Sequence, residues 1–469
     1  MTAELITRVS PNRVPSIDRR RQYRRRAHRS DLLVTLLWAS GAAAAALFLS
    51  VGGAGQFGSL AESLTSLGIV TGLIGSDFIL VMLVLAARVP FIDRTIGHDR
   101  AMAVHRQLGK PAIYLLLAHG LLLIVGYNVG VSFDFAAWVT AMWELPDMPL
   151  AFIGLGLLLA VVVSSLVAVR KRFSYEAWHV VHLLSYLAVA FAIPHQLSNG
   201  GVLAAGSVQS IYWVALYVFA FGSILTYRFA QPLLASVRHD MRVERVVSEA
   251  TDVVSIELSG KHLDQLGAIG GQFFVWRFWN RSTWWHAHPL SLSARPTASR
   301  ARVTVRDLGA GSRSISSVRP GTHVWLEGPY GLFTDAARTA PKLAIIAAGI
   351  GVTPARALLE HSRLAPGEAT VVLRASDDTE AYLWQEFEEL ATSTDSKLYT
   401  MLGNRGVGAR AWMAARDEER GVTMRSIFPD LLDSDLYLCG PSAWLNVVEA
   451  DARAWGVPEH QIHSERFDW

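Results

Sequence analysis

The sequence predicts a multi-domain membrane protein, in which a six-helix transmembrane bundle is followed by an antiparallel β-barrel and then by a parallel α/β domain. The first observation is the distribution of charge, with 11 charged residues in 1–30, only 18 in 31–232 and 54 in 233–469. The second is the overall charged content of 18%, which is below the value of about 25% in ordinary globular domains. This pattern excludes a disordered chain and a single soluble domain, and a lone Cys439 excludes an intrachain disulfide.

Residues 1–30 form a basic tail. The tail carries nine Arg against Glu4 and Asp18, so its formal charge is +7, whereas the whole chain is +3. Short basic runs of this kind contact nucleic acid or an anionic membrane surface. Because an apolar stretch follows at once, we expect the tail to lie at the anionic cytoplasmic leaflet, and we expect no nucleic-acid partner.

Residues 31–232 form the predicted transmembrane domain, because six stretches are long and apolar enough to cross about 30 Å of hydrocarbon. These stretches cover about 32–51, 67–87, 111–129, 149–169, 177–194 and 208–227. Basic residues gather in the tail, in the loops 88–110 and 170–172 and at Arg228, whereas the alternate loops have no Lys or Arg. Since Lys and Arg accumulate on the cytoplasmic side, we expect a multi-pass protein of the plasma membrane with both termini in the cytoplasm.

Two pairs of histidines lie near the ends of the third and fifth spans. His105 and His119 are 14 residues apart, which is a rise of roughly 21 Å on nearly the same helix face. His182 and His195 are 13 residues apart, which is a rise of roughly 20 Å. Because both helices run from inside to outside, the matched depths predict two haem sites, one between His105 and His182 and the other between His119 and His195.

Some details of the membrane half leave alternatives open. His182 and His195 lie about 140° apart on an ideal helix, so we expect Pro194 to distort the backbone. His179, one turn before His182, is an alternative ligand by geometry. Asp77 lies near the middle of the second span, where a carboxyl group is costly. Three interpretations of Asp77 remain open. It could be a proton relay or a polar partner of a buried cofactor, or the span could be shifted so that Asp77 lies nearer the membrane surface.

The pattern changes after residue 236 to short alternating runs. The runs 253–258 and 301–305 are typical of strands with one buried face, and they predict an antiparallel barrel over 237–336. This barrel is the second predicted domain.

A third domain over 340–469 begins with a fully buried strand at 343–348. The strand runs into the turn Gly349-Ile350-Gly351-Val352-Thr353-Pro354 and then into a helix, an arrangement in which backbone amides approach a pyrophosphate. Together with short apolar strands at 370–373 and 436–438, this predicts a Rossmann-like domain that binds a dinucleotide.

The order of these motifs resembles the ferric reductase and NADPH oxidase superfamily, in which a six-helix, two-haem membrane domain is fused to a ferredoxin–NADP reductase-like module. The resemblance covers residues 31–469. Besides the glycine turn at Gly349, it rests on a flavin motif, a second glycine turn, an element that closes the flavin domain, a Cys-Gly-Pro sequence and a terminal Glu-x-Phe. These are His288-Pro289-Leu290-Ser291 after Phe273, Gly309-Ala310-Gly311-Ser312, Gly328-Pro329-Tyr330-Gly331, Cys439-Gly440-Pro441 and Glu465-Arg466-Phe467.

The resemblance implies roles for these residues. Ser291 would lie near flavin N5, Cys439 beside the nicotinamide, and either Phe467 or Trp469 over the flavin ring. The residues implied to bind FAD are Phe273, His288, Pro289, Leu290, Ser291, Gly309, Gly311 and Ser312. Those implied to bind the nicotinamide nucleotide are Gly349, Gly351, Thr353, Pro354, Gly440 and Pro441. The histidine spacings also match the family and favour His182 over His179.

The identity of the nucleotide depends on residues after the second strand of the third domain. Arg374 and Ser376 stand where a 2′-phosphate would lie, and Arg405 adds a further cation, so NADPH is expected. Asp377 and Asp378 would instead suit the ribose hydroxyl of NADH.

The expected function is transmembrane electron transfer, from cytoplasmic NADPH through FAD and two b-type haems to an outer acceptor. That acceptor is O2, giving superoxide, or a ferric chelate. The alternatives are a haem-binding membrane sensor or transport protein, or a quinone-linked cytochrome, with a vestigial reductase module. The sequence leaves the acceptor, the oligomeric state and the regulation open.

Overall fold

The chain folds as two units. The structure is a computed structural model that describes residues 16–130, 134–173, 175–199, 201–280, 285–408 and 411–467. The first unit comprises Ser30–Phe229, and the second joins the described residues up to Arg29 with those from Ala230 onward. We call them the membrane unit and the reductase unit.

Six helices among the described residues are long and apolar enough to cross a bilayer, which confirms the predicted number of spans. They are α1 (Ser16–Ser50), α2 (Leu60–Ala86), α4 (His98–Tyr127), α6 (Met148–Ser165), α8 (Tyr175–Ser198) and α9 (Val208–Ile224). Shorter helices connect them, namely α3 (Pro90–Ile96), α5 (Phe135–Glu144) and α7 (Val167–Arg170). The last span continues through a π-helix (Leu225–Ala230) into α10 (Gln231–His239).

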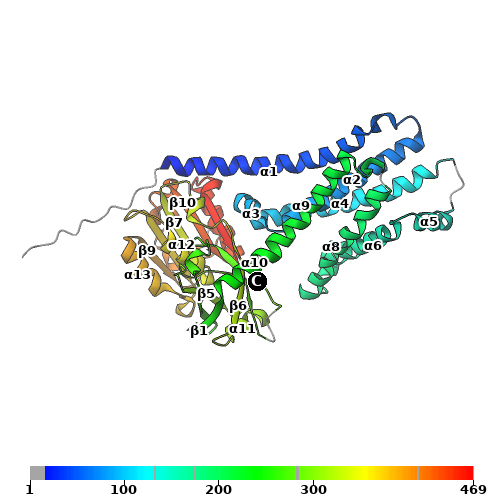
Figure 1. Ribbon diagram of the computed structural model, residues 1–469. Coiled ribbons are helices and arrows are strands. Elements are labelled where there is room, and N and C mark those ends of the chain that lie inside the picture. Colours follow the sequence, from blue (N-terminus) through cyan, green and yellow to red (C-terminus); the bar gives the residue numbers. More distant parts are fainter. Residues whose placement is uncertain are drawn as a thin grey trace, which may run out of the picture. The chain divides into compact units, whose positions relative to one another are not determined.

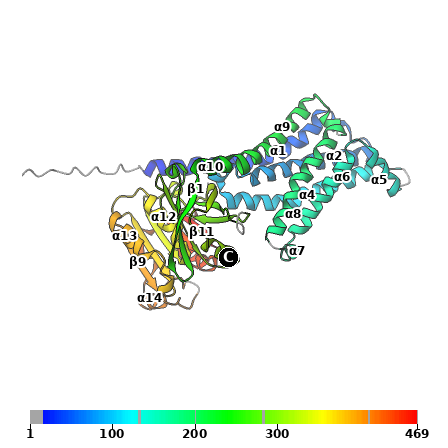
Figure 2. The same cartoon turned by 60° about the horizontal axis from the view of Figure 1, so that its bottom comes forward.

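Close packing in the membrane unit pairs α2 with α4 and with α9, and α6 with α8 (Figures 1 and 2). Glycines on α2 allow the approach of α4. A Cβ on Gly72 would lie 2.5 Å from Nδ1 of His119, and a Cβ on Gly75 would lie 3.1 Å from the side chain of Leu116. Small residues commonly permit such contacts between membrane helices. As a result, α2 forms a wall directly behind the histidines of α4.

Helix α1 differs from the expectation, because it begins at Ser16 and not near residue 32. The arginines of the tail favour this extension, since Arg is a good helix former. Within the reductase unit, Arg19 Nη1 donates hydrogen bonds to the carbonyl oxygens of Ala340 (3.0 Å) and Pro341 (3.3 Å). Part of the basic tail is therefore an ordered helix that contacts the reductase unit.

The first part of the reductase unit is an antiparallel barrel. Its strands are β1 (Met241–Ala250), β2 (Val253–Ser259), β3 (Phe273–Phe278), β4 (His288–Ser291), β5 (Arg300–Arg306) and β6 (His323–Tyr330). Their order in the described sheet is β4-β3-β6-β1-β2-β5, and a bridge between Leu292 and Val303 closes it. Alternate residues of β3, Phe274, Trp276 and Phe278, are fully buried in the barrel core, as the two-residue period of a strand requires. Helix α11 (Ala310–Ser316) follows β5.

The second part is a parallel sheet covered by helices. Its described strands run in the order β11-β10-β7-β8-β9. They are β7 (Lys342–Ala348), β8 (Ala369–Ala375), β9 (Lys397–Leu402), β10 (Ser434–Gly440) and β11 (Ile462–Arg466). The helices are α12 (Val352–His361), α13 (Trp384–Thr394), α14 (Ala415–Glu419), α15 (Met424–Ile427) and α16 (Ser442–Ala454). The strand order reverses between β7 and β10, and ligands bind at such a switch point in open α/β sheets.

Candidate functional site

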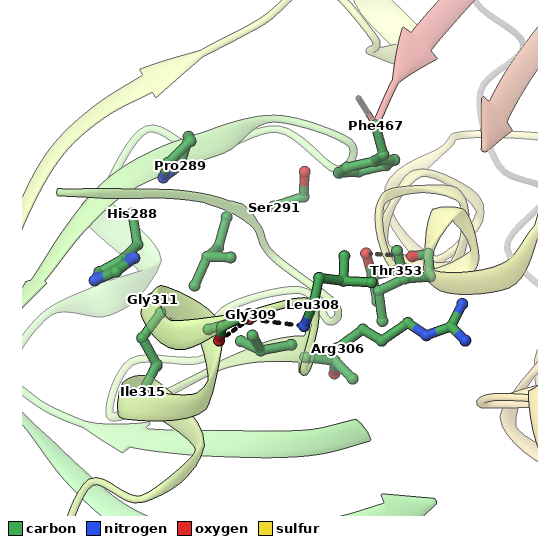
Figure 3. Close-up of a pocket in the computed structure, with 15 residues that line it drawn as sticks. His288, Pro289, Ser291, Arg306, Leu308, Gly309, Gly311, Ile315, Thr353 and Phe467 are labelled. Carbon is green, nitrogen blue, oxygen red and sulfur yellow. Dashed lines mark hydrogen bonds between the residues drawn. The ribbon is translucent and has the colours of Figure 1, made fainter. Parts of the chain in front are cut away.

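One cavity gathers the motifs of both parts of the reductase unit (Figure 3). Its volume is about 370 Å³, which is within the range of small-molecule sites. The residues that line it are His288, Pro289, Leu290, Ser291, Thr304, Val305, Arg306, Leu308, Gly309, Gly311, Ser312, Ile315, Ile350, Thr353 and Phe467. The flavin motif, the second glycine turn and Thr353 thus meet at one place, although they are distant in the sequence.

Strand β4 supplies the wall that contains His288 and Ser291. Nε2 of His288 is buried and has no hydrogen-bond partner among the described residues. Burial, with smaller contributions from the neighbouring His286 and Arg277, lowers the pKa of His288 to about 4. The imidazole is therefore neutral near pH 7, and it offers an unused polar atom to a ligand in the cavity.

The turn at Gly309 forms the opposite wall in Figure 3, where His288 and Gly311 lie close to each other. Ser312 Oγ accepts a hydrogen bond from the backbone N–H of Leu308 (2.8 Å) and donates one to the carbonyl oxygen of Gly309 (3.1 Å). A Cβ on Gly309 would meet no atom within 4 Å, so this stretch of backbone borders open space. A bare backbone held by its own serine can receive the diphosphate of a dinucleotide.

Phe467 lines the cavity beside Thr353 and Ser291 (Figure 3). Its backbone N–H donates to the carbonyl oxygen of Gly440 (3.3 Å), which fixes the end of the chain against β10. Trp469, the alternative aromatic, lies outside the described residues. An aromatic ring at this position can cover a flat ligand.

The glycine turn after β7 lies against the end of β10. A Cβ on Gly351 would lie 2.5 Å from the carbonyl oxygen of Cys439, so only glycine permits this approach. Gly349 has a φ of +54°, and a Cβ there would meet nothing within 4 Å. Cys439 is fully buried in the core, and burial raises the pKa of its thiol well above the usual range. The thiol is therefore protonated, and its predicted place beside the nicotinamide stays a prediction.

Other predicted residues lie near the cavity without lining it. The ring of Phe273 contacts that of Tyr330, with centroids 5.8 Å apart, because its side chain is on the face of β3 opposite the barrel core. Pro354 is buried in α12, and Pro441 precedes the first residue of α16. Gly440 ends β10.

The predicted 2′-phosphate residues occupy two different environments. Arg374 is almost fully buried, and its guanidinium donates to the carbonyl oxygens of Ala375 and Gly403 at the ends of β8 and β9. Arg405 is exposed on the loop that follows β9. The backbone N–H of Ser376 donates to Glu380 Oε2 (3.4 Å). Arg374 thus holds the two loops together, and Arg405 is the more accessible cation.

Sequence reasoning missed Arg306 and five uncharged lining residues. Arg306 ends β5, where Nε donates to Asp252 Oδ2 (2.7 Å) and Nη2 to Glu380 Oε1 (3.2 Å). A charged residue at the end of a buried strand, three positions before a glycine turn, was the available signal. The uncharged residues are Thr304, Val305, Leu308, Ile315 and Ile350. They follow ordinary strand and helix patterns, which give no sign of a ligand.

In the membrane unit, the structure brings His105 and His182 together. Their ring centroids lie 6.3 Å apart, with an angle of 56° between the planes. Imidazole nitrogens bind metal ions at about 2 Å, so two rings at this separation are close enough to share one ion. The pair would suit a haem iron, which accepts imidazole ligands.

Both histidines of α4 are anchored to the backbone of α2. Nδ1 of His105 lies 3.1 Å from the carbonyl oxygen of Met82, and Nδ1 of His119 lies 2.8 Å from that of Gly68. A carbonyl oxygen only accepts, so each Nδ1 carries the proton and leaves Nε2 as a metal ligand. This anchoring is the arrangement that metal-binding imidazoles commonly use.

The histidines of α8 differ in their neighbours. His195 lies close enough to His119 for an electrostatic interaction. His182 lies likewise within range of both His105 and His179. The ring of His182 also stacks on Trp178, with centroids 4.9 Å apart. Pro194 lies inside α8, which continues to Ser198.

Asp77 is buried on a face of α2 that points away from α4. It follows Gly72, which faces His119, by five positions, or about 140° around the helix. Ser40 Oγ of α1 donates to Asp77 Oδ1 (2.6 Å), and Tyr212 of α9 is in electrostatic range. The carboxyl group therefore joins α1, α2 and α9, on the side of α2 away from the α4 histidines.

Comparisons with known proteins identify both units. The family described as the ferric reductase like transmembrane component matches residues 71–193. Ferredoxin–NADP reductase B of Sorangium cellulosum is 32% identical over 174 residues, which are 35% of this chain and 70% of that protein. The ferredoxin reductase component of 3-ketosteroid-9-alpha-monooxygenase from Mycolicibacterium smegmatis is 26% identical over 49% of this chain and 65% of that protein.

Among solved structures, the FAD/NAD-binding domain of nitric oxide dioxygenase from Vibrio cholerae matches 49% of this chain and 99% of that domain, with 22% identity and a TM-score of 0.41. The chain spans 42% of the glycine betaine monooxygenase reductase subunit of Pseudomonas aeruginosa, and so less than two thirds of it.

The predicted resemblance is confirmed, since a ferric reductase-like transmembrane domain precedes a ferredoxin–NADP reductase-type module in one chain. The module makes the protein an NAD(P)H-dependent oxidoreductase that binds FAD and a nicotinamide nucleotide. The reductase module belongs to the ferredoxin–NADP reductase family, and the chain has the fused architecture of the ferric reductase and NADPH oxidase superfamily.

Proposed function

We propose that this protein carries electrons from cytoplasmic NADPH across the plasma membrane to an outer acceptor. The observation that carries the proposal is the pairing of His105 with His182 in a chain that also holds a complete reductase unit. FAD, when bound, takes two electrons as a hydride and gives them up singly, and haem iron carries one electron at a time.

Residues of the cavity bind and orient the flavin. The neutral His288 offers Nε2 as a hydrogen-bonding atom, and the turn at Gly309, Gly311 and Ser312 presents backbone to the diphosphate. Ser291 would lie near flavin N5, and the Phe467 ring would cover the flavin. These roles follow from the family resemblance and from the position of each residue in the cavity wall.

The nicotinamide nucleotide binds at the switch point of the parallel sheet. The turn Gly349–Gly351 receives its diphosphate, and the backbone of Cys439 packs against the turn. We favour NADPH, because Arg405 is an exposed cation on the loop that Arg374 holds against β8. NADH is the second candidate, because Asp377 and Asp378 follow the same strand.

Four histidines hold two haems at two depths. His105 and His182 would bind the haem nearer the cytoplasm, and His119 and His195 the outer one. The hydrogen bonds from Nδ1 to Met82 and Gly68 fix the rings of the α4 ligands and leave Nε2 to the iron. The basic loops favour a cytoplasmic location for both termini and for the reductase unit.

The acceptor is O2, which would give superoxide, or a ferric chelate. The test uses inverted sealed vesicles, with NADPH or NADH added to the exposed reductase unit and probes for superoxide and ferrous iron enclosed within. We expect an enclosed probe to respond, and we expect His119→Ala to abolish that response while NADPH still reduces the flavin.

The same preparation separates the alternatives. Haem-loaded protein without a bis-histidine b-type spectrum would contradict the haem assignment. Reduction of the haems by an added quinol, without oxidation of NADPH, would favour the quinone-linked cytochrome. Bound haem with a flavin that NADPH never reduces would favour a sensor or transport protein.

A further inference from the structure

A partly buried cluster of charged side chains joins the barrel to the parallel-sheet domain beside the flavin cavity. Its centre is Ser293, which is fully buried and lies two residues after Ser291. Its Oγ accepts a hydrogen bond from Thr304 Oγ1 (2.8 Å), and Thr304 lines the cavity. Ser293 is therefore bonded directly to a residue of the cavity wall.

Two arginines bind Ser293 from opposite domains. Arg302 of β5 donates from Nε to Ser293 Oγ (3.1 Å) and from Nη2 to its carbonyl oxygen (3.2 Å). Arg356 of α12 donates from Nη1 to the same carbonyl oxygen (3.0 Å). The two guanidinium groups converge on one peptide, and their like charges would repel each other without a shared anion.

Glu386 of α13 supplies that anion. Its carboxylate accepts both arms of Arg302, with Nη1 to Oε1 and Nη2 to Oε2 each at 2.8 Å, and it also forms an ion pair with Arg356. Side-chain exposure is 18% for Arg302, 11% for Arg356 and 27% for Glu386, so solvent screens this cluster only in part. Bidentate pairing of this kind fixes geometry as well as charge.

Two neighbouring contacts strengthen the same interface. Glu360 Oε2 accepts hydrogen bonds from Arg356 Nη1 (2.8 Å) and from the backbone N–H of Arg295 (2.6 Å) in the barrel. A Cβ on Gly270 of the barrel would overlap the carbonyl oxygen of Ala357 in α12. The backbones of the two domains thus touch where glycine alone allows it.

We infer that Glu386, Arg302 and Arg356 form an interdomain clamp that sets the separation between the nicotinamide and the flavin during hydride transfer. The inference rests on the proposed flavin site. In this reaction the nicotinamide nucleotide loses one hydride with its two electrons and the flavin gains it, so no further reactant is needed. The three residues are positioning residues, since they hold Ser293 and α12 and need not touch either cofactor.

The test is the rate of flavin reduction by NADPH, followed without oxygen in the full-length protein. For Glu386→Gln we expect the rate at saturating NADPH to fall about 10- to 100-fold, because a displacement of about 1 Å can have an effect of that size. The NADPH concentration for half-maximal rate should change much less. The deuterium isotope effect should rise, because the hydride step becomes more completely rate-limiting. Glu386→Asp keeps the charge, so its rate of flavin reduction should fall less. Gly270→Ala should slow the same step without altering any charge.

The matched control is Glu459→Gln. Glu459, between α16 and β11, accepts hydrogen bonds from Arg453 Nε (2.8 Å) and Nη2 (3.1 Å), which is also a bidentate pairing. This variant should keep the wild-type rate and isotope effect. The clamp is refuted if Glu386→Gln retains its flavin and reduces it within about twofold of wild type, or if Glu459→Gln is equally slow. Should Glu386→Gln lose its flavin, the rates of Glu386→Asp and Gly270→Ala decide, and wild-type rates in both would equally refute the clamp. If NADPH fails to reduce the flavin of the wild-type protein, this result would instead contradict the proposed function.

Discussion

The membrane unit and the reductase unit build their sites by different physical means. In the membrane unit, two helices carry the four histidines, and each histidine of α4 is anchored by one carbonyl oxygen of α2. In the reductase unit, the cavity wall comes from segments between His288 and Phe467, held together by hydrogen bonds and ion pairs across two domains. The first site therefore depends on helix phase and close packing, and the second depends on how two domains are joined.

The largest expected effect tests the choice of ligand in α8. His182→Ala should remove the haem nearer the cytoplasm and lower transmembrane electron transfer by at least about 100-fold, because disturbing even an outer-shell partner of a metal ligand costs about 10- to 100-fold. Flavin reduction by NADPH should be unchanged, since it takes place in the other unit. Haem content and the reduced spectrum measure the loss.

His179→Ala is the matched control, because it removes an imidazole one turn away on the same helix. It should keep both haems. Loss of haem from His179→Ala but not from His182→Ala would reverse the assignment, and the 6.3 Å pairing of His105 with His182 would then have no role in iron binding.

A smaller effect is expected from the wall behind His119. In Gly72→Ala, the new Cβ would lie 2.5 Å from Nδ1 of His119 and displace the ring from the carbonyl oxygen of Gly68. Overpacking costs about 1–3 kcal/mol, so retention of the outer haem should fall by roughly tenfold or more. A redox titration should then show one haem in place of two.

Gly156→Ala provides the comparison, because a Cβ on Gly156 of α6 would meet no atom within 4 Å. This variant should retain both haems. Equal haem loss from the two variants would mean that the membrane unit responds to any added methyl group, and not to the position of His119.

The membrane unit was the easier half to predict from sequence. The length of an apolar span fixes the number of helices, and a 3.6-residue period places His105 and His119 on one face before any contact is known. The anchoring of those rings was not predictable, because it depends on Met82, Gly68 and Gly72 of another helix.

The reductase unit shows the opposite balance. Its glycine turns and the His288-Pro289-Leu290-Ser291 motif were recognisable, but only as members of an ordered set. The clamp at Ser293 pairs Arg302 with Glu386, which is 84 positions away, and single charged residues on strands and helices give no sign of their partners. Arg374 was expected at a phosphate and instead binds backbone carbonyl oxygens, since the sequence does not reveal that its side chain is buried.

The smallest expected effect concerns pH and the reductase unit alone. The pKa of His288 is about 4 in the folded protein and 6.5 when the side chain is free, so the unfolded chain binds more protons between these values. The free energy of unfolding should therefore fall as the pH drops from 6.5 towards 4, by up to about 3 kcal/mol from this group. His288→Gln should reduce the slope of the free energy of unfolding against pH, as measured by urea unfolding followed by tryptophan fluorescence.

Glu257→Gln is the control, because Arg245 lowers the pKa of Glu257 below its usual 4.5 and confines its contribution to more acidic solutions. If wild type and His288→Gln have the same slope between pH 4.5 and 6.5, the imidazole is not held neutral by burial. The hydrogen-bonding role proposed for Nε2 would then lose its physical basis, and the reductase cavity would resemble the membrane unit in depending on packing alone.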